Sequence, residues 1–377
     1  MPKNVQIQAF HDKNGHLTEF AGFNLPLWFK GIIPESLAVR NAAGIFDVSH
    51  MGRALVRGRD SLRFLNHITT NDVSSLTNGA GQYSLLCNPV GGIKDDVLIF
   101  NLQPDQYLIV YNAANRASDY EWFTSTKEGF DVEVEDISDT VAMFAVQGPK
   151  AVTLMSKLAD AQLGDLPRFA CNWAEIAGSK VLLSRTGYTG EDGFEVFVWD
   201  APIGNAIKAQ KVWDRILEEG KPVGLEPCGL GARDLLRLEA GLCLYGTDMN
   251  ENTNPFEARL GFVVKLSKDF IGKSSLLEVK GKGPRKLRVG LVTENRVIPR
   301  HGFSIHLKEE EIGHVTSGTL SPLLDKGIAL AYTTPQNANP GNVVQVRIRD
   351  RFEEAKLVKT PFYDTNKYGY SRRTNSV

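Results

Sequence analysis

The chain has 377 residues and a formal net charge of −1, with 42% hydrophobic and 23% charged residues, which is typical of a soluble globular protein. The near-zero charge argues against a nucleic-acid-binding protein, and the lack of any apolar run of about 18 residues argues against a membrane-spanning one. Four cysteines without C-x-x-C spacing and seven histidines without an H-E-x-x-H motif disfavour a disulfide framework and a metal centre.

Helices and strands alternate in the first part of the chain. Residues 35–43 are expected to be helical, and "DSLRFLNHIT" predicts a helix that has Asp60 as its N-cap. Three strands are expected in series over 83–87, 95–102 and 106–112, because turns containing Pro, Gly and Asp separate these apolar stretches. The next stretch, "RASDYEWFTST", predicts a further helix.

The middle of the chain continues this alternation. "VAMFAVQGPKAVTLMSKLA" predicts a strand, a turn at Gly148–Pro149 and then a helix. "SKVLLSRTGYTGEDGFEVFV" predicts two strands around a glycine-rich loop, and "LGARDLLRLEAG" predicts a helix that ends at Gly241. Together these elements predict an α+β region with antiparallel strands as far as about residue 275.

The residue pattern of the sequence changes after "KGKGPRK", which begins at Lys280. Short strand-like stretches and turns follow, such as "LRVGLV", "GIALAYT" and "VVQVRIR". They predict an all-β module that forms a small barrel or a sandwich. We therefore place a domain boundary near residue 280 and expect two domains, 1–280 and 281–377.

Two adjacent acids stand at the start of an apolar run in "NPVGGIKDDVLIF". Side chains alternate between the faces of a strand, so Asp95 should share a face with Val97, and Asp96 with Leu98. The pattern alone favours two acids at a strand end, one hydrated and one capping a turn. The alternative is that one carboxylate faces a pocket and binds or activates a basic nitrogen.

Two further stretches carry candidate functional residues. In "RTGYTGEDGFEVF", Glu195 lies inside an apolar strand and needs a partner, either in a structural salt bridge or in a ligand, while Glu191 and Asp192 are expected to be exposed loop acids. Arg233 and Arg237 are four residues apart and share one face of a helix. That face could hold Glu195 or an anionic ligand, although ion pairing on the helix surface is the simpler interpretation.

Many stretches along the whole chain resemble the aminomethyltransferase family, the T-protein of the glycine cleavage system. They follow the family's order and include "FAGFNLPLWF", "FDVSHMG", "QYSLLCNPVGGIKDDVLIF", "VQGPKA", "RTGYTGEDGFEVF", "GARDLLRLEAGLCLYGTDM", "NPFEARLGFVVKL" and "GHVTSGTLSPLLDKGIALAY". The resemblance implies an α+β fold with a three-part, cloverleaf-like arrangement around a central folate cavity and a C-terminal all-β barrel.

The same resemblance implies a reaction and its residues. The family transfers a one-carbon unit from an aminomethyl-lipoyl H-protein to tetrahydrofolate, giving 5,10-methylenetetrahydrofolate and ammonia, and its catalytic aspartate matches Asp96. The matching folate-binding positions are Glu195, Arg233, Tyr83, Met51, Asn112, Tyr188 and Phe262. Glu195 would accept two pterin donors, and Arg233 would orient that carboxylate, keep it ionised or bond the pterin's acceptors. Phe262 replaces a tryptophan that is usual in the family, and a Phe ring can also pack on a flat ring.

Two alternatives share this scaffold. One is a tetrahydrofolate-dependent demethylase of a small methylated substrate. The other is a non-enzymatic folate-binding protein of iron–sulfur assembly, whose K-G-C-Y-x-G-Q-E signature differs from the "GYTGEDGFE" found here. The N-terminus lacks an apolar or Arg-rich leader, so we expect a cytoplasmic protein. We also expect a monomer or weak dimer that uses no metal.

Overall fold

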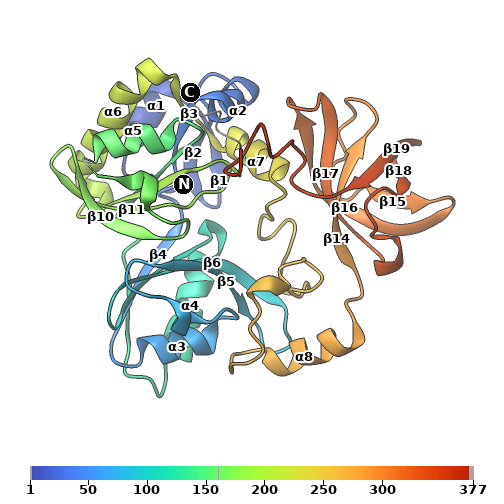
Figure 1. Ribbon diagram of the computed structural model, residues 1–377, viewed down its shortest axis with the longest axis horizontal. Coiled ribbons are helices and arrows are strands. Elements are labelled where there is room, and N and C mark those ends of the chain that lie inside the picture. Colours follow the sequence, from blue (N-terminus) through green and yellow to red (C-terminus); the bar gives the residue numbers. More distant parts are fainter. Residues whose placement is uncertain (1, 160, 373–377) are drawn as a thin grey trace. The chain divides into compact units, whose positions relative to one another are not determined.

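The computed structural model describes residues 2–159 and 161–372, and the chain divides into two compact units. The first unit comprises Met1–Ser84 and Asp96–Arg233, and the second comprises Leu85–Asp95 and Asp234–Val377. Figure 1 shows the elements in order along the chain. The helices are α1 (Gln8–Asn14), α2 (Ile32–Asn41), α3 (Ser61–Ile68), α4 (Arg116–Thr126), α5 (Ala151–Leu158), α6 (Ile207–Gly220), α7 (Leu230–Glu239) and α8 (Lys273–Lys282).

A six-stranded sheet forms the main layer of the first unit. Its strands, in spatial order, are β10 (Cys171–Ile176), β11 (Ser179–Ser184), β12 (Gly193–Val198), β9 (Ala142–Gln147), β3 (Ala43–Asp47) and β13 (Leu225–Pro227). Neighbouring strands are antiparallel except β13, which runs parallel to β3. One face carries Phe144 and Val196, which belong to a buried cluster with Leu154 of α5 and Trp213 of α6.

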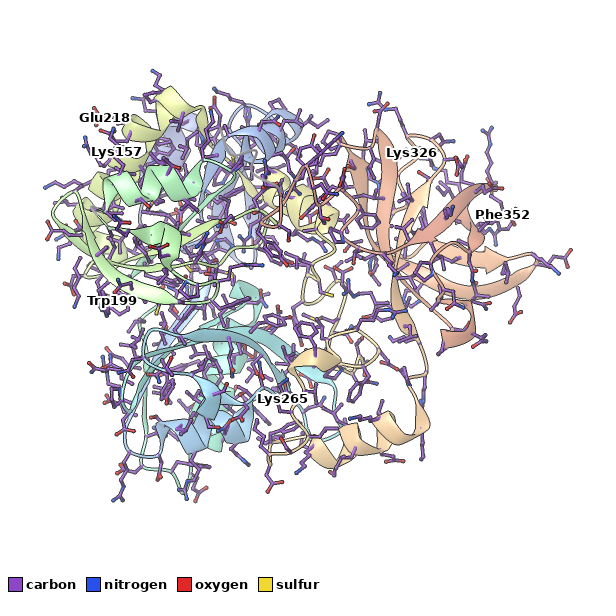
Figure 2. All side chains as sticks on the ribbon, in the orientation of Figure 1. Lys157, Trp199, Glu218, Lys265, Lys326 and Phe352 are labelled. Atoms are coloured by element: carbon purple, nitrogen blue, oxygen red, sulfur yellow. The ribbon has the colours of Figure 1, made fainter. Side chains whose placement is uncertain are left out.

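The helices on this sheet are amphipathic. Trp213 is fully buried, and its ring lies 5.1 Å from that of Phe144. Lys157 of α5 and Glu218 of α6 are about three-quarters exposed, and Figure 2 shows both at the edge of the molecule. The apolar stripe of each helix therefore faces the sheet and its charged stripe faces solvent.

A five-stranded sheet forms the second layer of the first unit. Its spatial order is β5 (Gly81–Cys87), β6 (Ile93–Gln103), β7 (Gln106–Tyr111), β4 (Gly52–Arg57) and β8 (Glu133–Asp136), and a separate antiparallel pair is formed by β1 (His16–Phe20) and β2 (Phe23–Trp28). The rings of Phe100 on β6 and Phe197 on β12 lie 6.3 Å apart in an edge-to-face contact. The two sheets therefore face each other within this unit.

A closed six-stranded barrel dominates the second unit. Its strands run in the order β14 (Leu287–Thr293), β17 (Lys326–Thr333), β16 (Glu310–Ser321), β15 (Ser304–Leu307), β18 (Val343–Ile348) and β19 (Arg351–Val358). Its core contains small and branched residues such as Leu291, Ile305 and Ala331. The predicted all-β module is thus confirmed as a barrel rather than a sandwich, and the predicted α+β class is confirmed as well.

Two local expectations change in the structure. Helix α3 does begin directly after Asp60, but the Asp60 carboxylate does not cap it; instead it accepts the Asp131 N–H at 2.9 Å and pairs with Arg63 at 3.0 Å. Strand β6 begins at Ile93, two residues earlier than expected, so the acidic pair lies inside the strand. Within residues 2–159 and 161–372, no helix has both the length and the apolar character needed to span a bilayer.

Candidate active site

Asp96 is held between the two strands that flank β6. The Tyr83 hydroxyl on β5 donates to Asp96 Oδ2 at 3.1 Å. From the other side, Asn112, which directly follows β7, donates through Nδ2 to Asp96 Oδ1 at 2.7 Å. All three residues belong to the first unit and are partly exposed. The carboxylate is therefore fixed at both oxygens.

Asp95 points to the opposite face, as the strand alternation predicts. It is fully buried, as are Val97 and Ile99 on the same face, whereas Asp96 and Leu98 are only partly buried. The expectation that the two acids lie at a strand end is wrong, because β6 begins at Ile93 and both acids lie inside it. The backbone explains this, because the Ile93 N–H donates to Thr253 O at 2.9 Å and extends the strand past both acids.

Glu195 is a buried acid at the centre of the six-stranded sheet. It is only 4% exposed, and the Thr186 hydroxyl donates a short hydrogen bond to its Oε2. Burial raises the pKa of Glu195, although the Thr186 hydrogen bond and the charge of Arg233 both oppose that rise. Among the described residues, Thr186 is the recorded hydrogen-bond partner of Glu195, and no ion pair joins Glu195 to an arginine. Oε1 is therefore left for a ligand.

Arg233 lies close to Glu195 without a direct ion pair. Its guanidinium carbon is 4.8 Å from the centre of the Tyr188 ring, a cation–π contact. Burial lowers the pKa of Arg233, and the nearby Glu195 and Tyr188 counteract that effect. Arg233 and Tyr188 thus form one group with Glu195, as expected for residues of one binding site.

Arg237 does not share this environment. It belongs to the second unit, where it is 2% exposed and pairs with Asp248 at 2.5 Å and with Asp234 at 2.8 Å. The idea of a cationic helix face formed by Arg233 and Arg237 together is therefore not supported, because Arg237 is neutralised by its own acids.

The glycine-rich loop between β11 and β12 is tied down by buried polar contacts. Glu191 pairs with Arg40 at 2.9 Å with both side chains almost fully buried, and Asp192 pairs with Arg185 at 2.6 Å. The expectation that Glu191 would be an exposed loop acid is wrong, because it pairs with Arg40, which lies far away in the sequence. Asp192 is partly exposed and pairs with Arg185 of the same sequence stretch. A side chain at Gly187 would collide with Gln147, whose Nε2 donates to Thr186 O at 3.0 Å.

The two acidic groups lie on facing sheet surfaces. Asp96 and Phe100 point to one face of β6, and Glu195 and Phe197 point to one face of β12. Because the rings of Phe100 and Phe197 are in contact, these two faces look toward each other. The candidate site therefore comprises Asp96 on one sheet and Glu195 on the other, both inside the first unit.

His50 is a site neighbour that the sequence reasoning missed. It is 2% exposed, and its Nδ1 is recorded without a hydrogen-bond partner among the described residues. Burial lowers the pKa of His50 to about 3, and the charge of Arg233 contributes to that shift. His50 is therefore neutral at physiological pH. The only sequence signal was its position in "FDVSHMG", next to the predicted folate residue Met51, which is partly exposed.

Phe262 differs from the other predicted residues in the unit to which it belongs. It belongs to the second unit, in the short 3₁₀ turn Gly261–Val263, and is 67% exposed. An exposed aromatic ring is available for stacking. Its role in folate binding stays a prediction.

Comparisons with known proteins agree with this fold and site. Residues 7–268 match the family model described as the GCVT N-terminal domain, and residues 285–364 match the glycine cleavage T-protein C-terminal barrel domain. A probable aminomethyltransferase of Pyrococcus horikoshii is 45% identical, covering 99% of this chain and 100% of that protein. An aminomethyltransferase of Bacillus subtilis is also 45% identical, covering 95% of this chain and 98% of that protein.

A solved structure matches over nearly the same length. The crystal structure of glycine cleavage system aminomethyltransferase T from Bartonella henselae has a TM-score of 0.89 and 31% identity, covering 98% of this chain and 99% of that one. An α+β region followed by a C-terminal barrel is the fold of the aminomethyltransferase class. The chain belongs to the glycine cleavage T-protein family, as the sequence predicted.

Proposed function

We propose that this chain moves the one-carbon unit of an aminomethyl-lipoyl H-protein onto tetrahydrofolate, with release of ammonia and formation of 5,10-methylenetetrahydrofolate. Its family is folate-dependent and works with the H-protein. The observation that carries the proposal is the Asp96 carboxylate, which hydrogen bonds from Tyr83 and Asn112 hold at both oxygens, in the same unit as the buried Glu195.

Glu195 fits the donor side of a pterin ring. A pterin presents an amide N–H and an amino group side by side, and one carboxylate can accept from both. The structure supports this fit, since burial raises the pKa of Glu195 and one of its oxygens lacks a protein donor. Two donors from a ligand would stabilise the ionised form that burial penalises. Arg233, held over Tyr188, supplies the positive charge that keeps the carboxylate ionised.

Asp96 fits an acid–base role at the reacting nitrogens. The transfer forms two bonds from the carbon to folate nitrogens and breaks two others, the bond to the lipoyl sulfur, which leaves as a thiol, and the bond to the amine, which leaves as ammonia. The amine leaves well only when it carries an extra proton. A fixed carboxylate can stabilise the positive charge that develops there and can accept the proton that a folate nitrogen loses. The Tyr83 and Asn112 hydrogen bonds hold Asp96 in one orientation for both tasks.

The remaining predicted positions complete the proposal. Met51 and Tyr188 are partly exposed in the first unit and can line a folate, and Phe262 offers an exposed ring. The H-protein as donor, a cytoplasmic location and a monomeric or weakly dimeric state belong to the same proposal.

Ammonia release from aminomethylated H-protein tests this function directly. The proposal expects release that tetrahydrofolate strongly stimulates, together with one methylenetetrahydrofolate formed per ammonia. Demethylation of a small methylated donor without such release would point to a demethylase. Folate binding with neither reaction would point to a non-enzymatic protein, and either result would overturn the proposal.

A further inference from the structure

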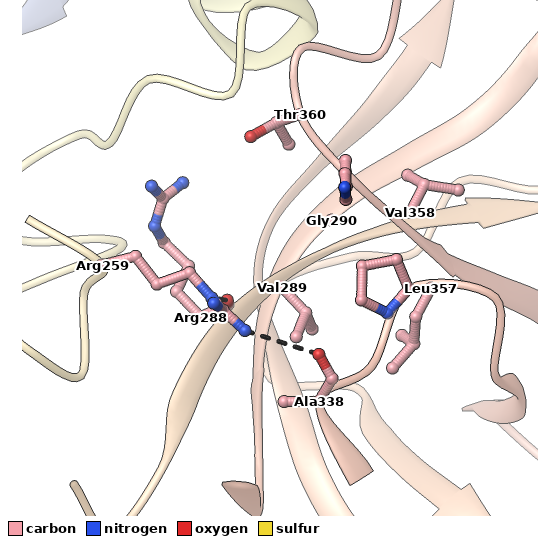
Figure 3. A pocket seen from close by; sticks show the side chains of 10 residues that line it. Arg259, Arg288, Val289, Gly290, Ala338, Leu357, Val358 and Thr360 are labelled. Carbon is pink, nitrogen blue, oxygen red and sulfur yellow. Dashed lines mark hydrogen bonds between the residues drawn. The ribbon is translucent and has the colours of Figure 1, made fainter.

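A pocket of about 380 Å³ lies in the second unit, against strands β14 and β19 of the barrel. Its lining residues are Arg259, Arg288, Val289, Gly290, Ala338, Pro340, Leu357, Val358, Lys359 and Thr360. Figure 3 shows the two arginines on one side of the pocket and Thr360, Gly290 and Val358 around it. None of these residues belongs to the candidate active site described above.

The pocket is cationic and has no acidic lining residue. Two arginines and one lysine line it, and none of its residues is Asp or Glu. Within the described part of the chain, Arg259, Arg288 and Lys359 form no ion pair with a carboxylate within 4.0 Å. Other arginines of the described chain do pair with carboxylates, for example Arg40, Arg185 and Arg237. Three positive charges thus converge without a counter-charge from the protein.

Backbone carbonyl groups accept hydrogen bonds from both guanidinium groups, and each guanidinium keeps one nitrogen that these bonds do not use. Arg288 donates from Nε to Ala258 O at 2.9 Å and from Nη1 to Gly241 O at 2.8 Å. Arg259 donates from Nε to Arg288 O at 2.6 Å and from Nη2 to Ala338 O at 3.4 Å, the dashed line in Figure 3. Arg259 Nη1 and Arg288 Nη2 are not used in these bonds, so each arginine is held in place with a further nitrogen available.

The positive charges of Arg259 and Arg288 repel each other, and a bound anion would relieve this repulsion. Burial and the charge of Arg288 both lower the pKa of Arg259, so the two cations repel each other. Guanidinium groups bind carboxylates and phosphates with matched geometry. The apolar side chains of Val289, Leu357 and Val358 supply the hydrophobic wall that small-molecule pockets usually have.

We propose that this pocket, formed by Arg259, Arg288, Lys359 and Thr360, is a binding site for a small organic anion that carries at least two negative charges on phosphate or carboxylate groups. The guanidinium groups and the lysine hold the charged end, and the Thr360 hydroxyl adds a donor. The apolar wall takes the organic part. Gly290 keeps room for it, because a side chain there would approach the Thr360 methyl group to 2.9 Å.

Calorimetric titration of the full chain at low salt tests the site. Inorganic pyrophosphate and citrate serve as probes for phosphate and carboxylate sources, and the tighter binder identifies the source. Lys359→Gln removes an exposed charge that makes no recorded bond to the protein, and Arg259→Gln removes one guanidinium. Each should weaken binding by about tenfold or more, the usual effect of losing one charge-assisted hydrogen bond.

Arg347→Gln is the matched control, since Arg347 is an exposed residue on β18 outside the pocket. It removes the same charge from the same barrel, and the affinity should stay at the wild-type value. Thermal unfolding without anion checks that all three variants fold. Absence of saturable binding to both probes, or equal affinities in the pocket variants and the control, would overturn the proposal.

Discussion

Glu195 shows what the sequence can and cannot predict about a single residue. Its place in an apolar strand predicts that it needs a partner, and the structure supplies Thr186 rather than a salt bridge. A neutral hydroxyl relieves the burial cost of a carboxylate only in part, so the pKa of Glu195 stays above its ordinary value. Selection for stability alone would favour an apolar residue or a direct ion pair at this position.

Replacing Glu195 by Gln should therefore separate binding from stability. The raised folded-state pKa means that ionised Glu195 costs stability as the pH rises above the ordinary pKa of a glutamate. Glu195→Gln should raise the melting temperature at pH 7 while it weakens tetrahydrofolate binding by about tenfold to a hundredfold. Calorimetry and thermal unfolding measure the two effects, with the exposed Glu175→Gln as the control. Unchanged folate affinity would remove Glu195 from the pterin site.

His50 should make the fold sensitive to mild acid. Its pKa is about 3 in the folded protein and near 6.5 when unfolded, so the unfolded chain takes up a proton that the folded chain refuses. Stability from this source is complete above pH 6.5 and falls by up to about 1.4 kcal/mol per pH unit as the pH drops toward 3. His50→Asn should flatten the dependence of the unfolding free energy on pH in urea titrations. His16→Asn, at an exposed position, should leave the slope as it is, and equal slopes in wild type and His50→Asn would contradict this account.

At the scale of single elements, local patterns predict strands well and their partners poorly. The alternation of Asp95 and Asp96 between two faces follows from strand geometry alone and is confirmed. The burial of Glu191 could not be predicted in this way, because its partner Arg40 lies on α2, far away in the sequence. The start of β6 at Ile93 likewise depends on a hydrogen bond to Thr253. The local sequence does not predict this bond, because Thr253 lies far away along the chain.

The ion pair between Arg237 on α7 and Asp248 should be important for the second unit. Asp248 also accepts hydrogen bonds from Thr316 at 2.5 Å and Ser317 at 2.7 Å on β16. Arg237→Ala would leave this buried carboxylate without its cation. We expect the free energy of unfolding to fall by roughly 3–5 kcal/mol, the usual range when one partner of a buried ion pair is removed. Chemical denaturation should show the loss, while Arg347→Gln on the barrel surface should cost under about 0.5 kcal/mol. A cost as small as the control's would show that the hydroxyl groups alone satisfy Asp248.

At the scale of the whole chain, the sequence texture predicts the barrel but not the exact division of the chain. The change after Lys280 reflects real strands, since β14 begins at Leu287. The compact units nevertheless divide at Asp234 and assign Leu85–Asp95 to the barrel's unit, through contacts such as that of Ser275 Oγ with Pro89 O at 3.0 Å. Such non-local contacts leave no trace in composition, so the boundary near residue 280 stays a prediction.

Limited proteolysis tests that boundary. Lys282 ends α8 and lies between the two matched domain regions, and Arg285 and Lys286 follow at the start of the second region. We expect trypsin to cut first in this stretch and to release a barrel fragment from a larger N-terminal fragment, because exposed connections are cut before packed elements. Mass spectrometry of the first products identifies the site. First cleavage near residue 234 would favour the division into compact units instead.

The assignment of Asp96 as the catalytic acid is the central claim, and the rate of methylenetetrahydrofolate formation in Asp96→Asn tests it most directly. With aminomethylated H-protein as donor, the rate should fall about a hundredfold or more, the usual scale for a lost acid–base group, while tetrahydrofolate affinity stays close to that of the wild type. Asp95→Asn serves as the neighbouring control, because the Asp95 side chain points to the buried face of β6. Normal turnover in a folded Asp96→Asn, with loss of turnover in a folded Asp95→Asn, would contradict the claim.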